Sequence, residues 1–424
     1  MFATNPTDAL VAGAGPVGLT AALTLAQRGL SIELLDEEPR PAAQSYALAL
    51  HPGSLEILDH IHLLGDVLRC GHPVRRIAFY NSTGRVGELS LDQFSADYPS
   101  VVVIGQDTLE RLLVEKLRHL GTQVLWNHRL SAIDQHEQNV TTAVDELDVS
   151  GGGYATYTTD WAIERSFCHD TSYVIGADGH NSCLRRALGI DNPEVAPPQL
   201  YAIFEFATGE NLDDEVRIIL GDDFTDVIWP LGENRCRWSF QLHDNQWGDD
   251  SRNKQRLAVF IGGSAYPHLT LDDLRKLSHD RAPWFDGWIG ELRWAVMVRF
   301  EQRLAERFGT GRCWLAGDAA HLAAPVGVQS MNVGLSEAHE LATRIAHAIR
   351  DRRPPAVLDG YNTERLSQWR KLLCLDGNPV ALDSAPDWVR GHERQILSAL
   401  PASGQLLSRM LLELGIAEQS MQPV

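Results

Sequence analysis

Three stretches of the chain place glycines and a carboxylate directly after an apolar run, an arrangement that can hold a phosphate-bearing cofactor. The first is residues 8–36, DALVAGAGPVGLTAALTLAQRGLSIELLD. Gly13 permits a tight turn, Gly15 lets the backbone approach a pyrophosphate, and Gly18 lets a helix pack on a strand. That helix offers its unpaired N–H groups to the pyrophosphate. Asp36, 18 residues beyond Gly18, stands where an acid accepts hydrogen bonds from ribose hydroxyls. The stretch predicts dinucleotide binding.

The same pattern returns twice later in the chain. Residues 173–179 (YVIGADG) are an apolar strand that enters a glycine turn with an acid, and a short helix over 182–188 follows. Residues 312–318 (RCWLAGD) repeat the pattern before a loop and a long helix from about Met331 to Arg350. Three such turns indicate that several segments contribute to one cofactor site.

The elements between these turns can be predicted from periodicity and turn residues. Strands are expected at 9–12, 30–35, 122–126 and 291–300, and a β-hairpin around Asn81–Gly84. Helices are expected over 54–64 with Ser54 as N-cap, from Gln106 to Gly121, over 252–280 and through the tail 361–424. Regularly spaced strands over 199–243 predict one antiparallel sheet. The whole indicates an α/β fold with an inserted antiparallel sheet.

Composition and charge limit the classes of function. The chain has 424 residues, 44% hydrophobic and 22% charged, which is ordinary for a globular protein. The net charge of −19 argues against nucleic acid or an anionic membrane as a partner. No apolar run approaches the roughly 20 residues that span a bilayer. The start of the sequence lacks a signal peptide's basic region and apolar core. Six scattered cysteines favour reduced thiols in a cytoplasmic protein, and an oligomer remains possible.

Four segments in this order resemble the FAD-dependent aromatic hydroxylases of the para-hydroxybenzoate hydroxylase type. They are residues 13–36, 106–113, 176–185 (GADGHNSCLR) and 317–334 (GDAAHLAAPVGVQSMNVG). The resemblance spans residues 8 to about 370 and implies FAD as cofactor, NADH or NADPH as reductant, and O₂ and a small aromatic compound as substrates. In that family, reduced flavin and O₂ form a C4a-hydroperoxide that hydroxylates the substrate.

The resemblance also implies domain boundaries. The Rossmann-like FAD-binding domain would comprise residues 1–71, 104–190 and 291–375. The antiparallel-sheet substrate domain would comprise residues 72–103 and 191–290, and residues 376–424 would form a C-terminal helical segment.

The same resemblance assigns roles to individual residues. Asp36 would bind the adenosine ribose, Asp178 and Arg185 would support the cofactor region, and Asp318 would bind the ribityl chain or pyrophosphate. The helix near Met331 would direct its positive end at the electron-rich edge of the flavin. The residues expected to bind the cofactor are Gly13, Gly15, Pro16, Val17, Gly18, Asp36, Gln106, Asp178, Arg185, Gly317, Asp318, Pro325, Gln329, Ser330, Met331 and Asn332.

The chain departs from the family pattern in two places. Tyr46 stands where the family usually has arginine, and Val328 and Ser330 replace glycines of the loop before the long helix. Both new side chains should crowd the flavin or demand a changed backbone. An FAD-dependent oxidase, dehydrogenase or reductase without oxygen insertion is therefore the alternative to a monooxygenase. A halogenase is disfavoured because the chain has no WxWxIP stretch, and a non-catalytic flavin-binding regulator is disfavoured by the complete set of turns.

Catalytic residues are not fixed by the sequence, and the candidates are Tyr46, Pro325, Arg217 and Trp229. Arg217 could pair with a substrate carboxylate, although a surface arginine is the favoured interpretation. Trp229, Trp238 and Phe240 could line an aromatic pocket, but aromatic strand residues are more often core. His51 and His321 are interpreted as structural residues, His51 in a turn and His321 in a hydrogen bond.

Overall fold

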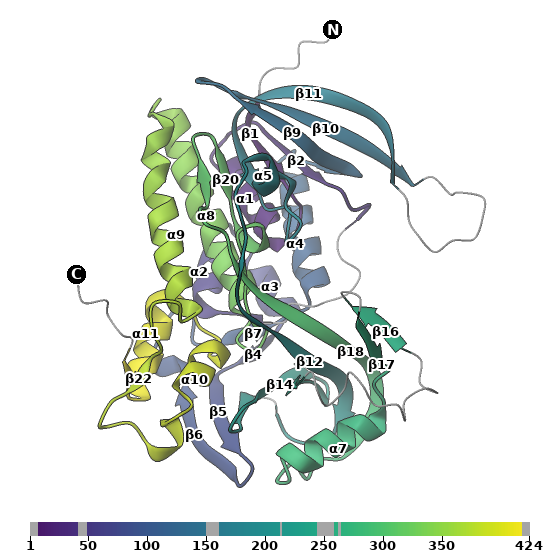
Figure 1. The fold of residues 1–424 in the computed structure, drawn as a ribbon, viewed down its shortest axis with the longest axis vertical. Helices are drawn as coiled ribbons and strands as arrows, with labels where there is room; N and C mark the ends of the chain where they lie inside the picture. Colours follow the sequence, from purple (N-terminus) through teal and green to yellow (C-terminus); the bar gives the residue numbers. More distant parts are fainter. Residues whose placement is uncertain are drawn as a thin grey trace.

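The computed structural model describes residues 7–40, 49–149, 161–212, 214–243, 258–261 and 264–417. These residues form two eight-stranded sheets, one in the upper and one in the lower half of Figure 1, with helices packed around them. The chain passes from the first sheet to the second and back again. In sequence, β12 and β18 of the second sheet lie between β11 and β20 of the first. The predicted α/β fold with an antiparallel sheet is confirmed.

The first sheet is parallel at its centre, where the strands run in the order β20-β11-β1-β2-β8. Antiparallel β19 pairs with β20, while antiparallel β10 and β9 extend from β11. The strands expected near 9–12, 30–35 and 122–126 are confirmed within two residues. The bounds are β1 (Thr7–Ala12), β2 (Ile32–Asp36), β8 (Val124–Trp126), β9 (His128–Gln135), β10 (Val140–Val149), β11 (Trp161–Gly176), β19 (Gly309–Thr310) and β20 (Cys313–Leu315).

Helices cover the first sheet and share one apolar core with it. The glycine turn leads into α1, which packs against α4 and α8. Leu19 and Leu23 of α1 and Leu109 and Leu113 of α4 are fully buried, as their helical spacing requires. The bounds are α1 (Pro16–Gln27), α2 (Pro52–His60), α3 (Leu64–Cys70), α4 (Gln106–His119), α5 (Cys183–Ala187), α8 (Gln329–Arg350) and α9 (Asp359–Leu372).

The second sheet has the order β21-β18-β12-β15-β14-β13-β5-β6. Its strands are antiparallel except where β5 runs parallel to β13, which brings the predicted hairpin around Asn81–Gly84 into this sheet. The bounds are β5 (Arg76–Asn81), β6 (Gly84–Ser90), β12 (Glu194–Thr208), β13 (Glu215–Leu220), β14 (Thr225–Gly232), β15 (Arg235–Leu242), β18 (Ile289–Leu304) and β21 (His321–Leu322). A small sheet of β3 (Ala49–Leu50), β7 (Val101–Val103) and β4 (His72–Val74) lies in sequence around that hairpin.

The two faces of the second sheet have different partners. One face buries Trp238 and Phe240 under α7 (Leu271–Arg281). The other face carries Ile203 and Trp229 and packs toward α10 (Glu393–Ala399) and α11 (Gly404–Glu413), the yellow helices of Figure 1. Because side chains alternate along a strand, neighbouring residues of one strand serve different cores.

Three expectations about local structure are wrong. The described part of 252–280 holds β16 (Ala258–Ile261) and β17 (Ser264–Pro267) before α7, so it is not one helix. The helix expected from Ser54 begins at Pro52, which is pre-organised for a first turn, and His51 is its N-cap. The tail is only partly helical, because β22 (Val380–Ala381) pairs with β23 (Ile416–Ala417).

No helix of the described residues is both long and apolar enough to cross a membrane. All six cysteines lie in the described ranges, and none forms a disulfide. Within those same ranges, no group of three or more His, Cys, Asp or Glu side chains could hold a metal ion.

Candidate functional site

The three glycine turns meet at the carboxyl edge of the first sheet. Four adjacent strands, β20, β11, β1 and β2, end there in Asp318, Asp178, the 13–18 turn and Asp36. Backbone hydrogen bonds join their ends: the Ala177 N–H donates to Ala12 O at 2.7 Å, and the Ala316 N–H donates to Gly176 O at 3.0 Å. The carboxyl edge is where open α/β sheets bind ligands.

Each glycine of the first turn is required for a different reason. Gly13 has φ +99°, and a Cβ there would lie 2.1 Å from the carbonyl oxygen of Ala177. A Cβ on Gly18 would lie 1.9 Å from the carbonyl oxygen of Gly13. Gly15 differs, because a Cβ there would meet no atom of the described residues within 4 Å. Gly13 and Gly18 are therefore fixed by packing, whereas Gly15 faces open space.

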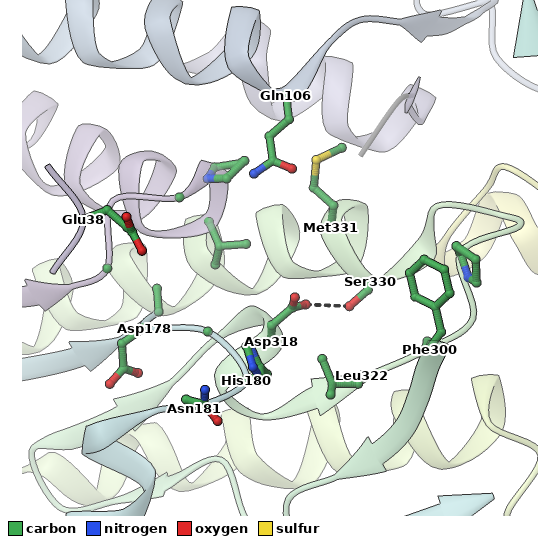
Figure 2. A pocket seen from close by; sticks show the side chains of 18 of the residues that line it. Glu38, Gln106, Asp178, His180, Asn181, Phe300, Asp318, Leu322, Ser330 and Met331 are labelled. Carbon is green, nitrogen blue, oxygen red and sulfur yellow. Dashed lines mark hydrogen bonds between the residues drawn. The ribbon is translucent and has the colours of Figure 1, made fainter. Parts of the chain in front are cut away.

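A cavity of about 780 Å³ extends from this turn to the second sheet. Figure 2 shows side chains from both halves of the molecule around it, with Gln106 and Met331 pointing toward one another and Asp318 and Ser330 below them. Twelve of the residues expected from the sequence line the cavity: Gly13, Gly15, Pro16, Val17, Asp36, Gln106, Asp178, Trp229, Asp318, Pro325, Ser330 and Met331.

Two cavity carboxylates are held by backbone N–H groups. Asp36 accepts from Ala14 N at 2.5 Å through Oδ2 and from Glu38 N at 2.8 Å through Oδ1. Asp178 Oδ2 accepts from Cys183 N at 2.7 Å and from Leu184 N at 3.1 Å. Asp178 Oδ1 is buried and has no hydrogen-bond partner among the residues described. Burial raises the pKa of both carboxyls.

The third carboxylate, Asp318, contacts one of the side chains that depart from the family pattern. Ser330 Oγ donates to Asp318 Oδ1 at 2.8 Å, the dashed line of Figure 2. Behind it, His321 Nε2 and Glu337 Oε2 lie 2.8 Å apart, and both side chains are fully buried. His321 also stacks on Trp369, with ring centroids 3.7 Å apart. His321 therefore has the structural hydrogen bond expected of it.

Val328, the other departure, has an unusual backbone. It is the N-cap of α8 and adopts φ +52° and ψ +34°, the left-handed region that a β-branched residue rarely enters. Its N–H donates to Pro325 O at 3.0 Å, and its side chain lines the cavity. The change from glycine keeps the turn but adds strain and bulk beside the cavity.

Several expected cofactor residues support the cavity without lining it. Arg185 Nη1 donates to Ala319 O at 2.7 Å and its Nη2 to His180 O at 2.8 Å, so it joins the second and third turns. Gly317 N–H donates to Glu337 Oε2 at 2.9 Å. Gly18 lies behind the first turn.

The first turn of α8 directs two expected side chains away from the cavity. Gln329 Nε2 donates to Leu397 O at 2.9 Å. Asn332 Oδ1 accepts from His51 N and from Ser54 Oγ, each at 2.7 Å, and its Nδ2 donates to Ala49 O. Their side chains therefore fix α8 against α2 and the C-terminal helices. The role of their backbone toward a flavin stays a prediction.

Arg217 fits neither the candidate role in substrate binding nor the favoured interpretation as a surface arginine. It lies outside the cavity lining and is nearly buried, bonded to Glu210 at 2.8 Å and to Glu215 at 2.7 Å. Tyr46 lies outside the described residues. Of the aromatic strand residues, Trp229 lines the cavity, while Trp238 and Phe240 belong to the core under α7.

Sequence reasoning missed the residues that line the cavity from the second sheet. Arg237 and Ser239 of β15 and Trp294, Arg299 and Phe300 of β18 all face it. Alternation along the predicted strand over 235–242 separates Arg237 and Ser239 from Trp238 and Phe240. That signal divides the strand into two faces but does not say which one meets the cofactor.

Burial of His51 should make the free energy of unfolding depend on pH. His51 is fully buried with Nε2 2.8 Å from Gly327 O, and burial lowers its pKa to about 4. As the pH falls below 6.5, His51 becomes protonated in the unfolded chain but stays neutral in the folded chain. The free energy of unfolding therefore falls. We expect His51→Gln to remove up to about 3 kcal/mol of this loss between pH 7.5 and 4.

Urea unfolding of wild type and variant at several pH values measures this difference. His279→Gln, at an exposed position on α7, is the control and should leave the pH dependence unchanged. A stability difference between His51→Gln and wild type that is constant with pH would contradict the assignment.

The site fits FAD on its own geometry. The N-cap of α1, Gly15, makes no side-chain hydrogen bond, so the first N–H groups of the helix are not capped by a side chain. The open space at Gly15, the unpartnered Asp178 Oδ1 and a cavity within the usual 300–1,000 Å³ of cofactor sites agree with a dinucleotide. The residues present therefore suit the pyrophosphate and ribose of FAD.

Comparison with known proteins agrees with this fit. A flavin-dependent monooxygenase of Mycobacteroides abscessus is 28% identical over 374 residues, 84% of this chain and 70% of that protein. Pentachlorophenol 4-monooxygenase of Sphingobium chlorophenolicum is 29% identical over 375 residues, 86% of this chain and 62% of that protein. The chain thus spans roughly two thirds of these relatives.

Solved structures show the same fold. Para-nitrophenol 4-monooxygenase PnpA from Pseudomonas putida superposes with a TM-score of 0.67 at 20% identity, over 97% of this chain and 94% of that one. The FAD binding domain family matches residues 6–200 and 271–376. The resemblance inferred from the four motif segments is confirmed, and the chain belongs to the FAD binding domain family, with the fold of the para-hydroxybenzoate hydroxylase-type flavoproteins.

Proposed function

We propose that this protein is an FAD-dependent monooxygenase that hydroxylates a small aromatic or polyketide-like substrate with O₂ and NADH or NADPH. The observation that carries the proposal is the single cavity that joins the glycine turns to an aromatic surface of the second sheet. The relatives' names, a flavin-dependent monooxygenase and a pentachlorophenol 4-monooxygenase, support it. The balanced reaction converts substrate C–H, NAD(P)H, H⁺ and O₂ into C–OH, NAD(P)⁺ and water.

The chain's own residues would bind, orient and shield. Gly13, Gly15 and the N-terminus of α1 would hold the pyrophosphate, and Asp36 the adenosine ribose. Asp318, oriented by Ser330, would hold the ribityl end. When bound, FAD would supply the redox chemistry needed to place one oxygen atom of O₂ on the substrate.

Apolar side chains line the part of the cavity where the substrate would bind. Ile203, Trp229 and Leu322 of the second sheet, with Pro325 and Met331 from the loop and helix that follow β21, would keep water from the reacting atoms. They would also hold an aromatic ring flat against the sheet.

The alternative is an FAD-dependent oxidase, dehydrogenase or reductase that does not insert oxygen. Val328 and Ser330 favour it, because their side chains occupy the cavity where the family has glycines. Crowding by these two side chains would change how a substrate reaches the flavin, whereas FAD itself would still bind.

Isotope labelling separates the two functions. The purified FAD-loaded protein is supplied with NADH or NADPH, ¹⁸O₂ and either 4-nitrophenol or 1-naphthol, both of which carry ring C–H bonds. We expect ¹⁸O in a hydroxylated product and faster NAD(P)H consumption when the aromatic compound is present. Release of one H₂O₂ for each NAD(P)H consumed, with no labelled product from any compound, would favour the oxidase. A protein that takes up no FAD would contradict both.

A further inference from the structure

The cavity face of the second sheet carries an ion pair between two indole rings. Cross-strand pairing aligns Trp229 with Arg237, Arg237 with Glu205, and Glu205 with Trp294, on β14, β15, β12 and β18. Directly paired residues project to the same side of a sheet. Trp229, Arg237 and Trp294 line the cavity, so this row, hereafter the Trp–Arg–Glu–Trp row, forms its floor.

Arg237 forms an ion pair with Glu205 within the row. Its Nη2 lies 2.8 Å and its Nε 3.2 Å from Glu205 Oε1, and the two side chains are 8% and 24% exposed. Its guanidinium carbon also lies 5.3 Å from the centroid of the Trp294 ring. The other arginine that lines the cavity from this sheet, Arg299, has a carboxylate 3.7 Å away in Glu301. The floor therefore presents polar N–H groups with little net positive charge.

We infer that this row selects a neutral planar aromatic substrate bearing a hydroxyl or carbonyl oxygen and rejects an arylcarboxylate. The inference rests on the proposed function and names its substrate class. A neutral oxygen can accept a hydrogen bond from Arg237 while the ring packs against the indoles. A carboxylate would lose its hydration and meet the like charge of Glu205, which repels it.

Glu205 is thus a specificity-determining residue rather than a catalytic one. Glu205→Gln keeps the size of the side chain but removes the negative charge that faces Arg237. The same floor should then attract an anion, since a guanidinium binds carboxylates strongly. The preference between neutral and anionic ligands should reverse.

The probes are 1-naphthol and 1-naphthoate, which differ in charge at pH 7.5 because phenols ionise near pH 10 and carboxylic acids near pH 4. Dissociation constants are measured on the FAD-loaded protein by calorimetry and by quenching of tryptophan fluorescence, without reductant. We expect wild type to bind 1-naphthol at least roughly tenfold more tightly, and Glu205→Gln to bind 1-naphthoate at least roughly tenfold more tightly than wild type does.

Glu210→Gln is the matched control. Glu210 pairs with Arg217 at 2.8 Å, and those side chains are 24% and 7% exposed, nearly the same as in the Glu205–Arg237 pair. Neither residue lines the cavity, so the ligand preference should not change. The double variant Glu205→Gln, Arg237→Gln should lose the gain in naphthoate affinity, because the guanidinium that causes it is absent.

Wild type that binds 1-naphthoate as tightly as 1-naphthol, or an unchanged preference in an FAD-loaded Glu205→Gln variant, would overturn the inference. Labelled product in the ¹⁸O₂ experiment would leave the proposed function intact in that case. If Glu205→Gln reverses the ligand preference but no oxygen is inserted in the ¹⁸O₂ experiment, the inference about specificity stands and the monooxygenase assignment is wrong.

Discussion

Gly15→Val should yield a folded protein that binds FAD far more weakly than wild type. A Cβ at Gly15 meets no described atom within 4 Å, so the side chain fits the protein itself. It would, however, fill the space where the backbone approaches a pyrophosphate, at the N-cap of α1. We expect FAD affinity to fall at least about a hundredfold, about 2.7 kcal/mol. Fluorescence titration of the apoprotein with FAD measures the affinity, and urea unfolding without FAD measures the stability.

Gly18→Ala separates this effect from simple loss of folding. Its Cβ would lie 1.9 Å from the carbonyl oxygen of Gly13, so the turn must shift and stability should fall together with FAD binding. If Gly15→Val retained wild-type flavin content, the assignment of the first turn to the pyrophosphate would be wrong.

Glu337→Ala should cause the largest loss of stability among single substitutions near the cavity. The Glu337 carboxylate is fully buried and accepts from Gly317 N at 2.9 Å, His321 Nε2 at 2.8 Å and Trp369 Nε1 at 2.7 Å. Alanine would leave all three donors without this acceptor. Breaking a buried ionic hydrogen-bond network costs about 3–5 kcal/mol. Urea unfolding of the apoprotein measures the change.

Glu340→Ala, one turn later on α8, provides the control. Glu340 pairs with Arg344 and Arg365, but its side chain is 28% exposed. Partly exposed pairs contribute at most about 1 kcal/mol, so the loss should be small. Equal effects of the two substitutions would show that the Glu337 network does not hold the third turn in place.

A folded Glu337→Ala variant should also lose FAD affinity, because Gly317 begins the turn that carries Asp318. This consequence can be measured at low temperature, where enough folded protein remains. If the variant kept its FAD affinity, the third turn would be held in place by Arg185 instead, because Arg185 donates a hydrogen bond to Ala319 O in the same turn.

The sequence by itself determined the parts of the site that depend on local backbone geometry. The glycines at 13 and 18 are needed for turn and helix packing, and both needs follow from glycine's missing Cβ. The strand, turn and helix around each motif were predicted within about two residues, because apolar runs, helix periodicity and glycine stops are local signals. The two long segments predicted wrongly, 252–280 and the tail 361–424, lacked such a consistent pattern.

Only the tertiary structure decided which strands are neighbours and which face of the second sheet meets the cofactor. The order β20-β11-β1-β2 brings Asp318, Asp178 and Asp36 together, although Asp36 and Asp318 are 282 residues apart in the sequence. Alternation gives two equivalent faces, and whether Arg237 or Arg217 faces the cavity depends on how β12, β13, β14 and β15 pair. A shift of one residue in that pairing would exchange every side chain between cavity and core, and this register is set by contacts between distant segments.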